Sequence, residues 1–148
     1  MIESLLCLSL NGFFEARGEP LQGQIAVHEV VINRVENPKF PDTICGVVLQ
    51  ENENGVCQFS WWCDLISNIP NEPNSFNTSK ALARLMIEEG DYISVIGSEA
   101  THYHAITIDP PYWTIGMDEI GVIGNHIFYK ERSKEDVTPL SRPANLFD

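Results

Sequence analysis

A single glutamate, Glu15, stands at the break between two apolar segments, where its carboxyl group could act as an acid. Apolar residues run at helical spacing up to Phe14, and Gly18 with Pro20 ends that helix, since proline cannot continue the hydrogen-bond ladder. Glu15 therefore falls in the last helical turn, where the helix dipole and the apolar neighbours both disfavour a carboxylate. A glutamate kept protonated near neutral pH is what cleavage of a glycosidic bond needs.

A second acid would be needed by a glycosidase that works with paired carboxylates. Glu19 precedes Pro20 and the next predicted helix, where negative charge is favoured, so we expect Glu19 to stay ionised and structural. Asp42 and Asp64 are the other nearby candidates. The sequence leaves their distances from Glu15 open, and none has a clear claim to be a nucleophile.

The segment 101–105 contains two histidines, His102 and His104, which alternation places on one side of a predicted strand. With His126 or Asp109 they could form a zinc site, and a zinc-dependent hydrolase is then an alternative to a glycosidase. The chain has no His-Glu-x-x-His pattern, and we expect no metal and no cofactor. His28 lies within the apolar second helix and is interpreted as structural.

Ordered blocks of sequence carry a family resemblance. They comprise residues 7–35, with Glu-Ala-Arg-Gly-Glu-Pro-Leu-Gln-Gly at their centre, and residues 40–50, 57–64, 100–105 and 123–129. In these blocks the chain resembles the cell wall hydrolase family that includes the spore cortex-lytic enzymes. The resemblance implies a lysozyme-like catalytic domain that cuts peptidoglycan between N-acetylmuramic acid and N-acetylglucosamine.

The resemblance also implies the reaction of a lytic transglycosylase. One glutamate, matched here by Glu15, protonates the glycosidic oxygen and then, as a base, helps the C6 hydroxyl of muramic acid attack its own anomeric carbon. The product is a 1,6-anhydro sugar. The rival enzyme is a zinc-dependent amidase that would use the histidines and cut the peptide from muramic acid. A non-catalytic peptidoglycan-binding module is the alternative from another class, and the intact block around Glu15 argues against it.

A small β-hairpin is predicted over residues 43–62, because both halves are rich in β-branched and aromatic residues and an Asn-Gly pair separates them. By the resemblance, this hairpin forms one wall of the sugar cleft. The residues expected to line the cleft are Gln58, Ser60, Trp61, His102, Tyr103 and His104. Amide and hydroxyl groups suit sugar hydroxyls, and an aromatic face stacks on a pyranose ring. Tyr103 would contact the substrate or orient Glu15, and the histidines would line the groove or anchor the following loop.

The organisation expected is one α+β, mostly helical domain over residues 1–132, with a tail over residues 133–148. The 148 residues, 43% of them hydrophobic, are enough for one sizeable core. A structural helix is predicted from Thr78 to Glu89, with Gly90 as its stop. We expect a loop from Ser67 to Ser75 that covers the cleft.

Charge separates the possible partners of the chain. Nine basic and 21 acidic residues give a net charge of −12, which argues against nucleic acid, and no apolar run is long enough for membrane insertion. The expected partner is the peptidoglycan glycan strand, bound by a monomer. Glu3 and Asn11 interrupt any signal-peptide pattern. Release like that of a phage endolysin, or trimming of an export segment, would then bring the chain to the wall or periplasm.

Four cysteines, at positions 7, 45, 57 and 63, lack the paired Cys-x-x-Cys spacing of a structural zinc site. Three disulfide connectivities are possible. Bridges would form outside a reducing cytoplasm and would brace the cleft.

Overall fold

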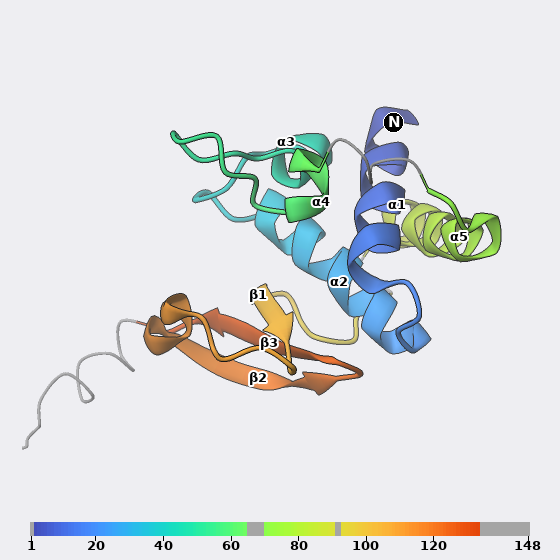
Figure 1. The fold of residues 1–148 in the computed structure, drawn as a ribbon. Helices are drawn as coiled ribbons and strands as arrows, with labels where there is room; N and C mark the ends of the chain where they lie inside the picture. Colours follow the sequence, from blue (N-terminus) through green and yellow to red (C-terminus); the bar gives the residue numbers. More distant parts are fainter. Residues whose placement is uncertain (1, 65–69, 91–92, 134–148) are drawn as a thin grey trace, which may run out of the picture.

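The chain folds into a group of helices followed by a small antiparallel sheet (Figure 1). The computed structural model describes residues 2–64, 70–90 and 93–133. The helices are α1 (Ile2–Ala16), α2 (Leu21–Val35), α3 (Ile44–Val48), α4 (Ser60–Cys63) and α5 (Pro73–Glu89). After them come β1 (Ala100–Ala105), the 3-10 helix η2 (Tyr112–Gly116), β2 (Met117–Ile123) and β3 (His126–Glu131). The α+β, mostly helical fold class predicted from the sequence is confirmed.

The break between α1 and α2 lies where glycine and proline predict it. Gly18 has a φ of 84°, a backbone conformation open to glycine, and Pro20 directly precedes the first residue of α2. The carbonyl of Pro20 accepts from the amide of Gln24 at 3.0 Å, which starts the helical ladder. Glu15 is therefore in the last turn of α1, as expected.

The sheet has the strand order β1-β3-β2, and its central strand β3 is antiparallel to both neighbours. Figure 1 shows β1 beside α2. Side chains alternate across the sheet, so Tyr103 and its cross-strand partner Phe128 face the helices. His102 and His104 face the other side, where both lie against Trp113 of η2.

The core consists of two clusters of buried side chains. One cluster joins α1, α2 and α5 to the segment 47–61, and the other joins the end of α1 and the middle of α2 to the sheet. Tyr103 packs against both clusters. The phenol thus lies where the helices meet the sheet.

A turn between β2 and β3 is tied to the start of α2. The Glu19 carboxylate accepts from the backbone N–H of Asn125 at 2.8 Å and from its side-chain amide at 3.0 Å. Gly124 has a φ of 58°, and a Cβ there would lie 2.3 Å from Glu19 Oε1. Partial burial raises the pKa of Glu19, but the Asn125 hydrogen bonds outweigh it and the pKa is lowered. Glu19 is ionised and structural, as expected.

The predicted hairpin over residues 43–62 is wrong in its main part. Residues 44–48 form α3, residues 60–63 form α4, and the two halves share a single bridge, between Glu51 and Cys57. Thr43 caps α3 by accepting from the Gly46 N–H at 2.9 Å, and a Cβ at position 46 would lie 2.7 Å from its hydroxyl oxygen. Burial of two valines in a helical turn outweighs their strand propensity.

The helix α5 begins earlier than predicted, at Pro73 rather than Thr78. Proline suits the first helical turn because the N–H that it lacks has no partner there. The predicted loop over residues 67–75 is therefore partly helical, and its residues 67–69 lie outside the described residues. Gly90, at a φ of 59°, ends the helix as predicted. The expected tail falls outside the described residues from position 134 onward.

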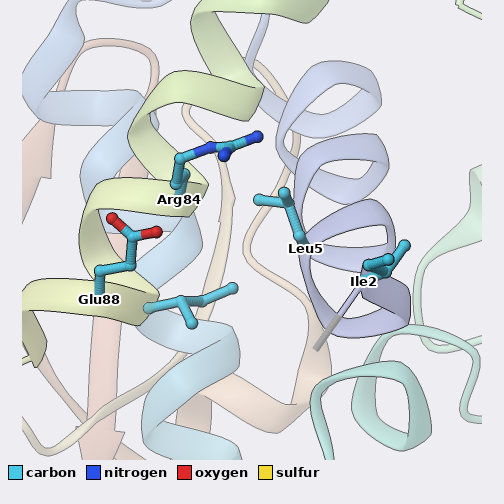
Figure 2. A pocket seen from close by; sticks show the side chains of 5 residues that line it. Ile2, Leu5, Arg84 and Glu88 are labelled. Carbon is cyan, nitrogen blue, oxygen red and sulfur yellow. The ribbon is translucent and has the colours of Figure 1, made fainter.

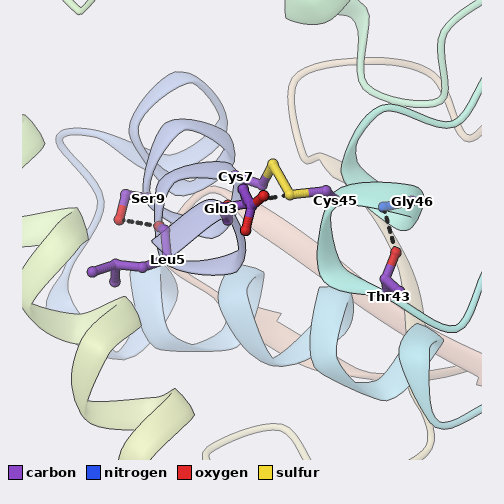
Figure 3. The surroundings of a disulfide bond; sticks show 7 residues. All are labelled: Glu3, Leu5, Cys7, Ser9, Thr43, Cys45 and Gly46. Atoms are coloured by element: carbon purple, nitrogen blue, oxygen red, sulfur yellow. Dashed lines mark hydrogen bonds between the residues drawn. A yellow bond between two sulfur atoms is a disulfide. The ribbon is translucent and has the colours of Figure 1, made fainter. Parts of the chain in front are cut away.

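Two disulfide bonds join the four cysteines. Cys7 on α1 is bonded to Cys45 on α3, and Figure 3 shows this bridge beside the Thr43 cap. Cys57 is bonded to Cys63, which closes the loop that leads into α4.

Within the described ranges, no helix combines the length and apolar character that crossing a bilayer requires.

Candidate active site

The carboxyl group of Glu15 lies where the end of α1 meets strand β1. The Tyr103 hydroxyl donates a hydrogen bond to Glu15 Oε1 at 2.5 Å. Burial and the adjacent Glu15 raise the pKa of Tyr103 well above its usual value, so the phenol keeps its proton and remains a donor. A donor fixed on Oε1 leaves Oε2 as the oxygen that can carry an acidic proton.

Burial raises the pKa of Glu15 above its usual value. The Tyr103 hydrogen bond and the positive charge of Arg34 each act in the opposite direction, because both favour the carboxylate. The raised pKa agrees with the direction expected from the apolar neighbours of Glu15. A carboxyl group in this setting keeps its proton to a higher pH than a solvated glutamate does, and the nearby cation favours its release.

Arg34, on α2, is a member of the site that sequence reasoning missed. Its side chain is 3% exposed, and its Nε donates to the carbonyl oxygen of Thr101 at 2.8 Å. The guanidinium also lies over the rings of Phe40 and Phe59, 5.0 and 5.3 Å from their centroids. The available signal was an arginine within the apolar run Val-Val-Ile-Asn-Arg-Val.

His102 and His104 lie on the opposite face of the sheet from Tyr103. His104 Nε2 accepts from the hydroxyl of Tyr129 at 2.8 Å, and its Nδ1 donates to the Ala105 carbonyl at 2.8 Å. Burial lowers the pKa of His102 to about 4, and the nearby Arg34 charge adds to this. The contacts of both rings with Trp113 match the expected alternative in which the histidines anchor the following loop.

The zinc site considered for the rival amidase does not assemble. In the parts of the chain that the structure describes, no group of three histidine, cysteine or acidic side chains lies close enough to hold a metal ion. Both ring nitrogens of His104 are engaged in hydrogen bonds, and the ring of His126 packs instead against Tyr103. The amidase hypothesis thus lacks a metal centre.

The three expected cleft residues in the segment 57–63 differ in position. Gln58 and Ser60 are exposed and free to meet a ligand. Trp61 is 6% exposed, stacks on Phe14 with centroids 5.0 Å apart, and donates its indole N–H to Asn11. The expectation that Trp61 presents a face to sugar is therefore corrected, because α4 turns this ring into the core below Phe14.

A separate pocket opens between α1 and α5 (Figure 2). It is lined by Ile2, Leu5, Arg84, Ile87 and Glu88. Ile2 and Glu15 stand at opposite ends of α1, about 20 Å apart at 1.5 Å per residue. This pocket is therefore distinct from the Glu15 site.

Comparisons with known proteins agree with one another. The profile of the family described as Cell Wall Hydrolase matches residues 18–129, a range that begins just after Glu15. The spore cortex-lytic enzyme of Bacillus subtilis (strain 168) is 32% identical over 114 residues, which are 77% of this chain and 33% of that protein. The chain thus spans about a third of the length of this curated relative.

Two solved structures have a similar fold. One is the catalytic domain of the germination-specific lytic transglycosylase SleB from Bacillus anthracis, with a TM-score of 0.66 and 29% identity, covering 86% of this chain and 93% of that one. The other is the catalytic domain of Bacillus cereus SleB, with a TM-score of 0.65 and 31% identity, covering 86% and 91%. The lysozyme-like catalytic domain that the family resemblance implied is confirmed.

Proposed function

Because the chain belongs to the cell wall hydrolase family, we propose that it cleaves peptidoglycan glycan strands as a lytic transglycosylase, with Glu15 as the acid and base. The observation that carries the proposal is the Glu15 carboxyl, held by Tyr103 and with a raised pKa. The similarity to a SleB catalytic domain described as a lytic transglycosylase supports this class of reaction.

The reaction would proceed in two proton transfers. Glu15 Oε2 gives its proton to the oxygen that links C1 of N-acetylmuramic acid to N-acetylglucosamine, and the C1–O bond breaks with its electron pair left on that oxygen. The resulting carboxylate then takes the proton of the C6 hydroxyl as O6 bonds to C1. The products are a 1,6-anhydromuramic end and a free N-acetylglucosamine hydroxyl, and Glu15 is protonated again.

Glu19, the next acidic residue after Glu15 in the sequence, is a poor candidate for a second catalytic carboxylate. Both Glu19 oxygens accept hydrogen bonds from Asn125, so this carboxylate is committed to the β2–β3 turn. Gln58 and Ser60 are the exposed groups of the segment 57–63 that suit acetamido and hydroxyl groups of the glycan.

Mass spectrometry of the fragments released from purified peptidoglycan tests the proposal. The wild type should yield 1,6-anhydro-muropeptides, and the Glu15→Gln variant should yield none while unfolding at the same urea concentration. Reducing ends instead of anhydro ends would mean that water, not the C6 hydroxyl, attacks C1. Free stem peptides from intact glycan, or undiminished release by Glu15→Gln, would contradict the proposal.

The setting in which the chain acts is part of the same proposal. Two disulfide bonds fit a protein that works outside the reducing cytosol, at the cell wall. Action as a phage-type endolysin is one route to that place, and a gene next to that of a membrane-permeabilising protein would support it. We expect the domain to act as a monomer, which light scattering of the purified protein would check.

A further inference from the structure

Arg34 is a buried cation, and no carboxylate of the described residues is bonded to it. A charge taken out of water is destabilising unless other groups replace its hydration. The Thr101 carbonyl accepts from Nε, and two aromatic faces lie against the guanidinium. Among the described residues, Nη1 is buried without a hydrogen-bond partner. Since this arrangement satisfies the guanidinium only in part, its presence calls for a reason beyond packing.

The position of Arg34 and the charges that act on it identify that reason. Its Nε is bonded to the carbonyl of Thr101 on β1, two residues before Tyr103, whose hydroxyl is bonded to Glu15. Burial lowers the pKa of Arg34 to about 10, so the group stays cationic at neutral pH, and the groups that favour its charge are Tyr103 and Glu15. Conversely, Tyr103 from β1 and Arg34 from α2 are the titratable groups of the described residues that act on Glu15. The three side chains form one electrostatic unit at the junction of α1, α2 and β1.

We propose that Arg34 is a positioning residue of this site, whose buried cation stabilises the Glu15 carboxylate formed when the proton leaves for the glycosidic oxygen. The proposal rests on the proposed function of Glu15 as acid and base. Burial alone would favour the protonated acid so strongly that proton donation becomes unfavourable. The cation of Arg34 offsets this effect, and Tyr103 adds a hydrogen bond to the same carboxylate.

The burial of Arg34 also restricts what it can do. A side chain that is 3% exposed has no surface to offer a glycan strand. Removing its charge should therefore leave KM within about twofold of the wild type and act on kcat instead. A group of opposite charge nearby commonly lowers a carboxyl pKa by about one unit or more. A loss of about tenfold in kcat follows, since one pKa unit is a factor of ten.

The test compares three variants. Arg34→Gln removes the charge and keeps a donor for the Thr101 carbonyl, while Arg34→Lys keeps the charge. Arg17→Gln is the matched control, because Arg17 also lies on an aromatic ring, that of Phe13, and pairs with Glu72 instead of Glu15. The readouts are kcat and KM against pH, and the ¹³C carboxyl shift of Glu15 in a pH titration by NMR.

Arg34→Gln should raise the pKa of Glu15 by about one unit or more, move the alkaline limb of kcat/KM upward by the same amount and lower kcat about tenfold. Arg34→Lys should restore most of the wild-type kcat and of the wild-type pKa of Glu15, and Arg17→Gln should change neither kcat nor that pKa. A folded Arg34→Gln protein with an unmoved Glu15 titration would overturn the proposal. If Arg34→Gln does not fold, a folded Arg34→Lys protein whose Glu15 titration departs by a full unit would also overturn it.

The two proposals fail in distinguishable ways. If the wild type releases no glycan fragments, the proposed function fails, and the NMR titration still decides whether Arg34 controls Glu15. If fragments form and depend on Glu15, but its titration ignores Arg34, the role assigned to Arg34 alone is wrong.

Discussion

His28 should make the stability of this fold sensitive to mild acid. Its side chain is fully buried between α1 and α5, where Nε2 donates to the Ser79 carbonyl at 3.0 Å. The space is so tight that a Cβ on Gly12 would lie 2.2 Å from the imidazole ring. Burial lowers the pKa of His28 from 6.5 to about 4, so the folded protein resists charging this ring.

The sign and size of the effect follow from linkage. Above pH 6.5 His28 is neutral in both the folded and the unfolded chain and adds no pH dependence. Between pH 6.5 and 4 the unfolded chain binds a proton that the folded chain excludes. The free energy of unfolding therefore decreases as the pH is lowered through this range. A difference of 2.5 units amounts to about 3 kcal/mol in full. About 2 kcal/mol of it is already lost at pH 5.

Urea unfolding followed by tryptophan fluorescence measures this loss. The wild type and His28→Gln should be compared at pH 7, 6 and 5, because glutamine can still donate to Ser79 but does not titrate. The stability of the wild type relative to the variant should fall by about 2 kcal/mol between pH 7 and 5. Other titrating groups cancel in this difference. A difference that stays constant with pH would refute the assignment of a neutral, buried His28.

Three further outcomes are expected. Tyr103→Phe should lower kcat about tenfold and raise the pKa of Glu15, since it removes a hydrogen bond worth about 1.5 kcal/mol; pH–rate profiles would show it. Gly124→Ala should lower the free energy of unfolding by about 1–2 kcal/mol, because its φ is 58°; thermal melts would check this. Replacing Cys7 and Cys45 by serine should lower the free energy of unfolding by about 4 kcal/mol, because the bridge closes a loop with a sequence separation of 38; urea unfolding would measure the loss.

Parts of the fold follow from local chemistry and can be predicted from the sequence. The ends of α1 near Gly18 and of α5 at Gly90 are examples. A glycine with a positive φ, or a proline without an amide hydrogen such as Pro20, ends a helix within a few residues. The hairpin prediction over residues 43–62 failed because strand propensity reflects packing on a sheet, and no sheet forms there. Thr43, as a helix cap, was a local signal for α3 that the β-branched pattern concealed.

The candidate site divides in the same way. The location of Glu15 in the last turn of the first helix was predicted from the sequence. Orientation of Glu15 by Tyr103 was one of two alternatives under the resemblance, and the structure brings the two side chains together. Strand alternation alone separates Tyr103 from His102 and His104, so their opposite faces could have been foreseen. For Arg34 the sequence offered only an arginine within an apolar run, and nothing local shows that such a residue will be buried under two aromatic rings.

The clasp between Glu19 and Asn125 bears on reactivity as well as on folding. Glu19 follows the acid by four residues, and Asn125 stands in the turn that starts β3, the strand paired with the Tyr103 strand. The clasp thus fixes the position of the end of α1, which carries Glu15, relative to the sheet, which carries Tyr103. Loosening this contact would weaken the hydrogen bond from Tyr103 to Glu15 and so raise the pKa of the proposed acid. The proposed reaction thus depends on a surface contact outside the pair formed by Glu15 and Tyr103.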